Sequence, residues 1–235
     1  MKLMTVVRRE DGAPREPIHE RCKRVPSVEG LVGWVANVAD VSQDPVGGGE
    51  PTAEAVIEIR LADGAPVDVD ALLAEVRGDR TAGGDRTVRC EVYEVEERLM
   101  WDRHGEWPIG EAAVGFNRIA LVPRLPSVSH DEFAAHWTDR HGPIAERHHP
   151  GIARYVQNIV LRSLTPGAPT WDGIAELHFV QTSDFTERMY DSPAGRAIVR
   201  DDVVRFIDPS RGERFLLGRW TILRDPIPRD NDHAR

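Results

Sequence analysis

The chain lacks the features that mark several classes of protein. Its 235 residues include only two cysteines, Cys22 and Cys90, which form no C-x-x-C pair and have no histidine partner at metal spacing. We therefore expect two reduced, buried thiols and no metal site. No apolar run approaches the length of a membrane span, and the run at the N-terminus is too short for a signal peptide. These absences predict a cytoplasmic protein without a membrane partner.

Basic clusters are also missing. The chain has 39 acidic and 30 basic residues and a formal net charge of −9. An acidic chain without a basic patch argues against nucleic acid and anionic membrane surfaces as partners. The composition, with 40% hydrophobic and 29% charged residues, is otherwise ordinary for a globular protein.

The chain contains an internal repeat. One pair of segments reads Pro-Ile-His-Glu-Arg and Pro-Ile-Ala-Glu-Arg, and a second pair reads Trp-Val-Ala-Asn-Val and Tyr-Val-Gln-Asn-Ile. The matching segments are residues 17–21 with 143–147, 34–38 with 155–159, and 55–61 with 174–179. A helix and a last strand follow in both halves. Similar segments in one order, at a nearly constant offset, indicate duplicated units.

Each half is expected to follow the order β-α-β-β-α-β, the ferredoxin-like unit. We therefore predict an α+β fold of two tandem ferredoxin-like halves, residues 1–110 and 111–225, followed by a disordered tail at 226–235. Helices cover one face of each sheet, and apolar strands such as 119–122 require the other face to be buried too. Packing of sheet against sheet would bury it, either within one chain as a closed barrel or between two chains.

The first half is shortened. Between its first strand, at residues 3–8, and Pro17 there is room for barely one helical turn. The second half has a longer helix at this point, with Phe133, Trp137 and His141 spaced four residues apart on one face. We therefore expect the functional site in the second half and a supporting sheet in the first.

His141 has two interpretations. Gly142 and Pro143 are expected to end the helix directly after it. An imidazole at a helix C-terminus is stabilised by the helix dipole and can cap free carbonyl groups. The alternative is a general acid or base beside a ligand cavity, because imidazole titrates near neutral pH. In that case Trp137, on the same face, would help to bind the substrate.

The second half resembles the EthD family of the dimeric α/β-barrel, ferredoxin-like superfamily. The resemblance covers roughly residues 115–225 and rests on Phe133, Trp137, His141, Gly142, Pro143, Tyr155, Asn158, Asp172, Gly173, Glu176 and Phe179. It implies a barrel-type core, a homodimer and a small-molecule substrate. Members of the family include cofactor-free dehydratases, cyclases, isomerases and monooxygenases. One departure is His178, where relatives usually carry a large apolar or aromatic residue.

A catalytic pair is predicted on the strand at 174–180. Glu176 and His178 are two residues apart and share one face, while Leu177 and Phe179 occupy the other. We expect the helices to cover the Leu177 face, which leaves Glu176 and His178 pointing into the barrel. A carboxyl group in an apolar cavity has a raised pKa, and a nearby imidazole can share its proton. The alternative is a buried pair held by structural hydrogen bonds.

Four further residues complete the predicted site. Tyr155 would serve as an oxyanion-hole donor, or alternatively as a core residue with a polar tip. Asn117, on the first strand of the second half, would contact a ligand. Asp172 is either a ligand contact or a turn residue before a glycine. The loops at 42–52 and 163–172 are expected to flank the mouths of equivalent cavities in the two halves, and Trp171 would cover the second cavity.

These residues favour a cofactor-independent lyase or isomerase, of the dehydratase or cyclase type, acting on a small carbonyl or polyketide-like compound. His178 and Glu176 would remove a proton next to the carbonyl group. His141 or Tyr155 would protonate the leaving oxygen or hold the enolate. One alternative is a cofactor-free or haem-dependent oxidoreductase, with His178 or His141 as the axial ligand, because related tandem barrels can hold haem. A non-catalytic small-molecule binding protein is also compatible with the sequence.

Overall fold

The computed structural model describes residues 1–10, 15–39, 52–78, 88–105 and 107–223. The expected tail at 226–235 and nearly all of the loop at 42–52 lie outside the described residues. Both cysteines are free and buried, as predicted. In the part of the chain that is described, no helix combines the length and the apolar character needed to cross a membrane.

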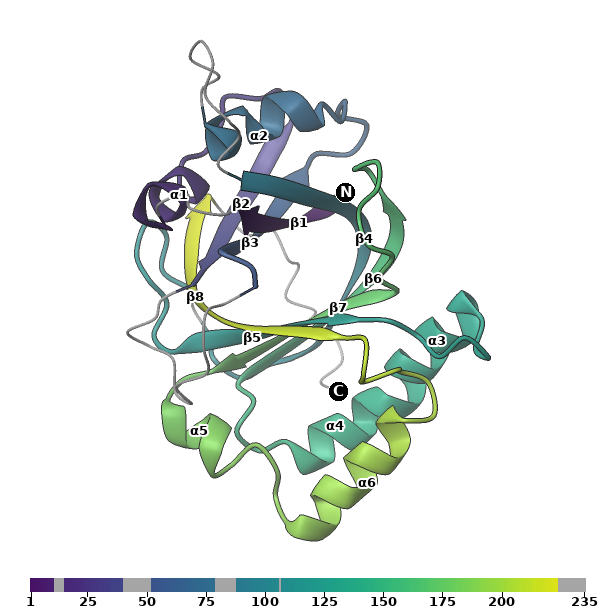
Figure 1. Cartoon of the computed structure of the whole chain (residues 1–235). Helices are drawn as coiled ribbons and strands as arrows, with labels where there is room; N and C mark the ends of the chain where they lie inside the picture. The colour runs from purple at the N-terminus through teal and green to yellow at the C-terminus, as the bar shows by residue number, and fades with distance from the viewer. Residues whose placement is uncertain (11–14, 40–51, 79–87, 106, 224–235) are drawn as a thin grey trace.

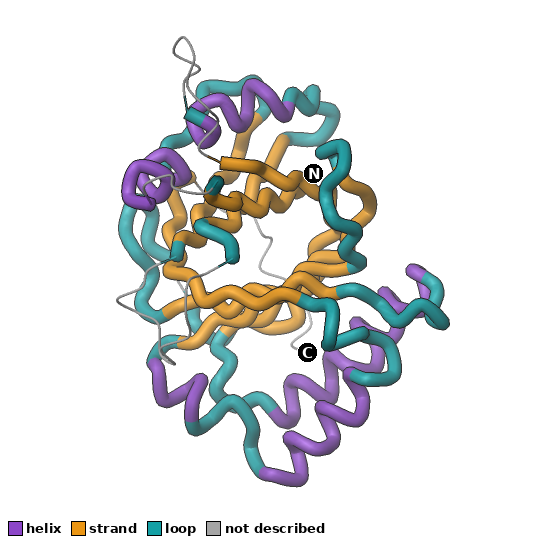
Figure 2. The backbone as a smooth tube through the Cα atoms, viewed as in Figure 1, coloured by secondary structure: helices purple, strands orange, loops and turns teal. Residues whose placement is uncertain are grey.

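The strands form one closed antiparallel barrel with the neighbour order β1-β3-β2-β8-β5-β7-β6-β4 (Figures 1 and 2). The strands are β1 (Lys2–Arg9), β2 (Leu31–Val38), β3 (Ala55–Leu61), β4 (Val88–Asp102), β5 (Phe116–Val122), β6 (Arg154–Ser163), β7 (Gly173–Phe179) and β8 (Glu213–Leu223). Strands β1 to β4 come from the first half and β5 to β8 from the second. The α+β barrel fold predicted from the sequence is therefore confirmed.

The barrel closes within one chain. Strand β8 of the second half pairs with β2 of the first, with Arg219 opposite Asn37. Strand β4 of the first half pairs with β6 of the second, with Glu97 opposite Asn158. These two pairings join the halves into a barrel without free sheet edges. The sequence left open whether one chain or two bury the inner face, and the structure shows that one chain does so. A second chain is not needed for closure, so the homodimer stays a prediction, as does the boundary near residue 110.

The two halves carry different helical covers on the outside of the barrel (Figure 1). The first half has α1 (Arg15–Cys22) and α2 (Val69–Arg77). The second half has α3 (His130–Ala135), the π-helical segment η2 (His136–His141), α4 (Gly142–His148), α5 (Thr182–Thr186) and α6 (Pro193–Val203). Helices α1 and α4 contain the repeated segments at 17–21 and 143–147. Segments α3 and η2 have no counterpart among the described residues of the first half, as expected.

The prediction that Gly142 and Pro143 end the helix is wrong. Gly142 has right-handed helical dihedrals, and α4 continues directly from η2. The wide turn of η2 lets the Gly142 N–H donate to the Trp137 carbonyl. Pro143 then falls in the first turn of α4, where its missing N–H is not needed. A Cβ at Gly142 would lie 2.4 Å from Met100 Cε, so glycine allows the helix to approach β4.

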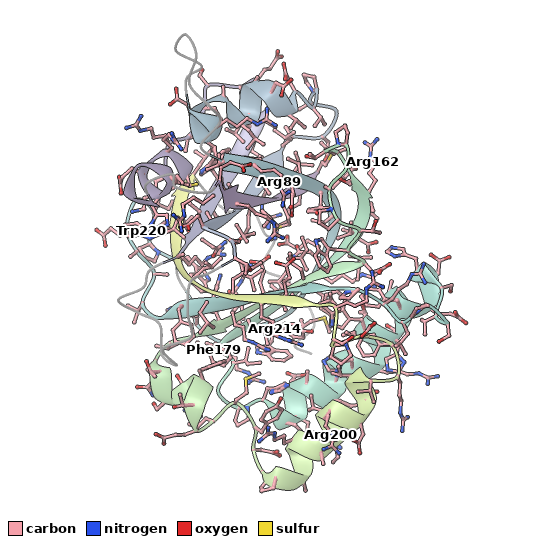
Figure 3. The ribbon with its side chains drawn as sticks, in the orientation of Figure 1. Arg89, Arg162, Phe179, Arg200, Arg214 and Trp220 are labelled. Atoms are coloured by element: carbon pink, nitrogen blue, oxygen red, sulfur yellow. The ribbon has the colours of Figure 1, made fainter. Side chains whose placement is uncertain are left out.

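Alternation along the strands divides the apolar residues into layers. The outer face of the first half packs against α1 and α2 around Trp34 and Leu73, and that of the second half packs around Phe133 and Trp137. Phe179 lies on this helix-covered side, where Figure 3 labels it. A third apolar cluster fills part of the barrel itself. The interior is thus built from residues of both halves.

Candidate functional site

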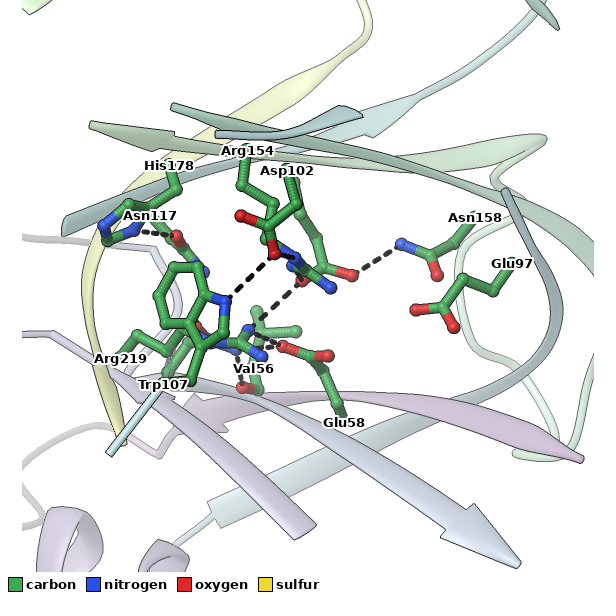
Figure 4. A network of polar contacts seen from close by, with 12 residues as sticks. Val56, Glu58, Glu97, Asp102, Trp107, Asn117, Arg154, Asn158, His178 and Arg219 are labelled. Atoms are coloured by element: carbon green, nitrogen blue, oxygen red, sulfur yellow. Dashed lines mark hydrogen bonds and ion pairs between the residues drawn. The ribbon is translucent and has the colours of Figure 1, made fainter. Parts of the chain in front are cut away.

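Polar side chains fill the part of the barrel interior that the apolar cluster leaves (Figure 4). Four cationic groups (Lys2, Arg60, Arg154 and Arg219) face four carboxyl groups (Glu58, Glu97, Asp102 and Glu176). The amides of Asn37, Asn117 and Asn158 and the imidazole of His178 lie among them. We call this set the barrel cluster. Burying so many charges is costly unless each one is paired, so their positions are tightly determined.

The barrel cluster contains the same asparagine–glutamate unit twice. In the first half, Asn37 Nδ2 donates to the Val56 carbonyl and to Glu58 Oε1, both at 3.1 Å. In the second half, Asn158 Nδ2 donates to the Ile174 carbonyl at 3.0 Å and to Glu176 Oε1 at 2.8 Å. The strand registers agree, because Asn37 is opposite Val56 and Asn158 is opposite Ile174. The duplication inferred from the sequence therefore extends to hydrogen bonds inside the barrel.

Lys2 joins the two units. Its Nζ lies 2.6 Å from Glu97 Oε1, 2.8 Å from Glu176 Oε1 and 3.3 Å from Glu58 Oε2. Burial by itself would lower the pKa of this ammonium group, but Glu176, Glu97 and Glu58 raise it above its ordinary value. Lys2 is therefore a permanently charged centre for three carboxyl groups.

The two glutamates of the repeated unit differ in the direction of their pKa shifts. Burial, followed by repulsion from Glu58, raises the pKa of Glu176. Burial acts on Glu58 in the same sense, but Arg219 and Lys2 outweigh it and hold the pKa of Glu58 well below its usual range. The raised pKa agrees with the expectation for a carboxyl group inside the barrel.

His178 is held by a chain of amides that begins at Glu58. Asn37 Nδ2 faces two acceptors, so Asn37 Oδ1 accepts from Asn117 Nδ2 at 2.8 Å. Asn117 Oδ1 therefore points at His178 Nδ1, 2.8 Å away, and this nitrogen must carry the ring proton. His178 Nε2 lies 3.0 Å from the Val114 carbonyl.

The charge on His178 is decided by its surroundings. Two neighbouring oxygens would suit a doubly protonated ring. Burial, and then the positive charge of Arg219, lower the pKa of His178 to about 3. Desolvation next to fixed cations outweighs two hydrogen bonds, so the ring is neutral at neutral pH. Its proton is on Nδ1, and Nε2 has the free lone pair of a base, with the Val114 carbonyl placed to stabilise the protonated form.

Aromatic side chains cover the barrel cluster near the end of β7. The rings of Trp107 and His104 lie 4.6 and 5.1 Å from that of His178. The guanidinium groups of Arg219 and Arg154 lie 4.8 and 5.6 Å from the Trp107 ring, which adds cation–π attraction. Trp107 Nε1 donates to Asp102 at 3.1 Å. Figure 4 shows Trp107 lying against these groups, so any ligand that reaches them from this end must displace the indole.

Of the residues predicted from the sequence, Glu176, His178 and Asn117 come together inside the barrel. Each is at most 1% exposed, and Asn117 bonds directly to His178. Glu176 instead bonds to Lys2 and Asn158. The two predicted catalytic residues thus share a face, as expected, but have different partners.

Three other predicted residues lie on the opposite side of the sheet. Trp137 Nε1 donates to the Tyr155 hydroxyl at 2.8 Å, and both side chains are buried beneath the helices. Burial raises the pKa of Tyr155 to about 12. His141 Nδ1 bonds to Asp202 of α6 at 2.9 Å. Successive side chains of a strand point to opposite faces, so Tyr155 points away from the interior, on the face opposite to Val156 and Asn158. The structure therefore does not bring Tyr155, Trp137 or His141 to the barrel cluster.

Asp172 and Trp171 lie at the start of β7, away from His178. Asp172 accepts from the backbone N–H of Arg124 at 2.9 Å and from its Nε at 3.0 Å, and it contacts His130. These contacts tie the segment before β7 to residues 124–130. Trp171 is buried in the apolar cluster of the interior with Tyr93, whose hydroxyl donates to the Pro169 carbonyl. Trp171 thus closes the apolar end of the barrel.

The barrel cluster does not fit a metal or a haem group. Carboxylate oxygens of Glu58, Glu97 and Glu176 lie within 4.8 Å of one another, but the Lys2 ammonium group binds all three. Both ring nitrogens of His178 contact oxygen atoms, and His141 lies outside the barrel. His178 is surrounded by charged groups, and neither histidine lies in an apolar pocket of the barrel, which haem binding requires.

A groove with a volume of about 500 Å³ lies on the outer surface. It runs between α2, with the residues before it, and residues 164–166. None of the predicted site residues lines it, and neither does any member of the barrel cluster. We therefore assign the candidate site to the barrel cluster, on its chemistry.

Sequence reasoning missed most of the first half's contribution. Lys2, Glu58, Glu97 and Trp107 of the first half were not identified, and neither were Arg154 and Arg219 of the second half. A signal existed for Glu58: the matched segments 34–38 and 55–61 align Asn37 with Asn158 and Glu58 with Glu176. No local pattern marks Lys2 or Arg219, because their partners lie on other strands.

Comparison with known proteins agrees with this architecture. Residues 125–210 match the EthD domain, as the resemblance predicted. A crystal structure described as an anthrone oxidase-like protein is 14% identical, covers 94% of this chain and 92% of its own, and superposes with a TM-score of 0.57. A chlorite dismutase from Candidatus Nitrospira defluvii is 12% identical over 93% of this chain and 90% of its own, with a TM-score of 0.47. No curated protein sequence matches the chain. At 14% identity, the likeness to the anthrone oxidase-like structure shows a shared fold only.

Proposed function

We propose that the protein is a small-molecule enzyme of the lyase or isomerase type that works by proton transfer, and the match of residues 125–210 to the EthD domain supports this. Its substrate is a small carbonyl or polyketide-like compound with an acidic C–H bond. The site is the barrel cluster, and no resident cofactor takes part. The observation that carries the proposal is a neutral imidazole buried beside two arginines and a carboxyl group of raised pKa.

His178 is the base in this proposal. Its Nε2 takes the proton from the carbon next to the carbonyl group, and the Val114 carbonyl accepts the hydrogen bond of the resulting imidazolium. A pKa of about 3 in the closed site makes the ring a weak base. The enolate formed in the same step brings a negative charge close to the ring. This charge raises the pKa of His178 during the proton transfer itself.

Arg154 and Arg219 hold the enolate oxygen. Both guanidinium groups are buried and face the Trp107 ring, so a planar conjugated substrate can replace the indole against them. Fixed positive groups in a dry site stabilise a developing oxyanion more strongly than water does. Glu176, the carboxyl group with the raised pKa, returns a proton to carbon or to a leaving oxygen.

Exchange of the acidic C–H for deuterium in D₂O tests this reaction. We expect the wild-type protein to accelerate exchange, followed by NMR, in at least one member of a panel of 1,3-dicarbonyl compounds and anthrone. His178→Gln should reduce the rate by about 10²- to 10⁴-fold, the usual contribution of a general base. His148→Gln is the matched control, since His148 lies outside the barrel and bonds to Asp191. No acceleration by the wild-type protein, or full rate in His178→Gln, would refute the proposal.

A second function, cofactor-free oxidation, starts from the same enolate. The structural likeness to the anthrone oxidase-like protein favours it over haem-dependent oxidation and over ligand binding without turnover. An enolate that reacts with O₂ consumes oxygen, whereas a lyase or isomerase does not. Measurement of oxygen uptake with anthrone therefore separates the two: uptake that depends on His178 indicates oxidation, and exchange without uptake indicates proton transfer alone.

A further inference from the structure

Glu58 and Glu176 meet at the centre of the barrel. They occupy equivalent positions of β3 and β7, and neither is more than 1% exposed. Carboxylate oxygens of the two lie within 4.8 Å of each other and of Glu97. Two carboxylates this close cannot both be ionised cheaply in a dry site.

The surrounding cations bind the two glutamates jointly. Lys2 Nζ contacts Glu176 Oε1 and Glu58 Oε2, and Arg219 Nη1 contacts Glu58 Oε1 and Glu176 Oε2. Nevertheless, Glu58 Oε2 and Glu176 Oε2 each lack a hydrogen bond. A proton on one carboxyl group that donates to the other supplies a missing bond without adding a residue.

Glu97 does not take this proton. It accepts bonds of 2.6 Å from Lys2 and from Arg60, which contacts both of its oxygens. Burial opposes its ionisation, but Lys2 and Arg60 lower its pKa. The glutamates with unsatisfied oxygens are therefore the pair from β3 and β7.

We propose that Glu58 and Glu176 form one carboxyl–carboxylate pair that holds a single proton, with Glu58 as the positioning residue that keeps the proton on Glu176. The role of this proton as the catalytic acid rests on the proposed function. The existence of the shared proton does not, because it follows from the geometry of the barrel cluster.

The shared proton changes the charge of the barrel cluster. The groups that face the pair are Lys2 on β1, Arg60 on β3, Glu97 and Asp102 on β4, Arg154 on β6, His178 on β7 and Arg219 on β8. With Glu176 protonated, four cations face three carboxylates while His178 is neutral. The single excess positive charge suits an anion such as an enolate, and transfer of the proton from Glu176 to that anion restores balance.

Infrared spectroscopy detects this proton directly, through the C=O stretch of a protonated carboxyl group. We expect the band in the wild-type protein at pH 7, well above the ordinary glutamic acid pKa of about 4.3. It should be lost in Glu176→Gln and also in Glu58→Gln, because Glu176 next to Lys2 and without a like charge ionises. The surface variant Glu94→Gln, which loses only an ion pair with Arg162, should keep it.

Each outcome decides one part of the proposal. Absence of the band from the wild-type protein at pH 7 overturns the shared proton, and this measurement needs no variant. A band that persists in Glu58→Gln shows that burial alone protonates Glu176, which overturns the role of Glu58. Circular dichroism checks that both glutamine variants are folded.

Kinetics separates this inference from the proposed function. In the exchange assay, Glu58→Gln should move the alkaline limb of the kcat profile to lower pH by at least about one unit, since Glu176 loses its proton earlier. A merely structural role would lower the rate without moving the limb. If the infrared result is as expected but no compound is exchanged, the proton pair stands and the proposed function fails.

Discussion

The two halves of the barrel share their inner faces but not their outer ones. Inside, Asn37 with Glu58 repeats the arrangement of Asn158 with Glu176, down to the backbone carbonyl that each amide contacts. Outside, the second half is covered by α3 and η2, which have no counterpart among the described residues of the first half. The inner residues of each half must fit those of the other, whereas each outer face packs only against its own helices. A duplicated barrel can therefore change its cover more freely than its interior.

The outer difference is visible at a single pair of positions. Ala55 begins β3 and Gly173 begins β7, and the two are equivalent by strand register. A Cβ on Gly173 would lie 2.1 Å from Trp137 Cζ3. The helical segment that carries Trp137, described only in the second half, thus explains why glycine stands there and alanine in the first.

The inner faces differ at two equivalent positions, where the first half has charged residues and the second half has neutral polar ones. By register, Lys2 corresponds to Asn117 and Arg60 to His178. The first half contributes fixed cations at these positions, and the second half contributes an amide and an imidazole. The candidate chemistry therefore lies on the second half, while the first half supplies the charges that tune it.

The largest expected effect concerns this inner difference at acid pH. The pKa of His178 falls from 6.5 to about 3 on folding, so the unfolded chain binds a proton between these values and the folded chain does not. Stability should therefore decrease as pH falls from 6.5 towards 3, by at most about 5 kcal/mol from this group. Urea denaturation at several pH values should show a shallower acid-side slope for His178→Gln. His149→Gln should remove a smaller part, since the pKa of His149 falls only to about 4, mainly through burial. An unchanged slope in His178→Gln would contradict the neutral, buried ring.

The second effect concerns the fixed cation of the first half. Lys2→Met leaves Glu58, Glu97 and Glu176 without their shared partner. We expect a loss of about 3–5 kcal/mol in the free energy of unfolding, as for other buried ion pairs that lose one member. Arg162→Met is the control, because its ion pair with Glu94 is exposed and should contribute no more than about 1 kcal/mol. Equal losses in the two variants would show that Lys2 does not organise the barrel cluster.

The smallest effect tests the outer difference. Gly173→Ala should destabilise the protein by about 1–3 kcal/mol, since the added methyl group collides with Trp137, which its bond to Tyr155 holds in place. The reverse change in the first half, Ala55→Gly, should cost about 0.5–1 kcal/mol through backbone entropy and lost packing. Thermal unfolding measures both. A neutral or stabilising Gly173→Ala would mean that the helix does not pack as closely as the structure shows.

The period of two along a strand was sufficient to predict part of the site. It predicted that Glu176 and His178 point into the barrel, where each is 1% exposed. The resemblance to the EthD family identified the fold and the half in which the family domain lies. The spacing of Trp137 and His141 correctly put them on one helix face, but nothing in that spacing told which side of the sheet the helix covers.

By itself, the sequence determined the strands, their inner and outer faces, and the duplication, because these follow from local alternation and from repeated order. The tertiary structure alone decided that the barrel closes within one chain and that Lys2 and Glu58 meet Glu176. It also decided that His141 bonds to Asp202 and not to a ligand site. Contacts between strands far apart in sequence depend on which edges pair and in which register. A buried charge then takes its pKa from the neighbours that this pairing provides.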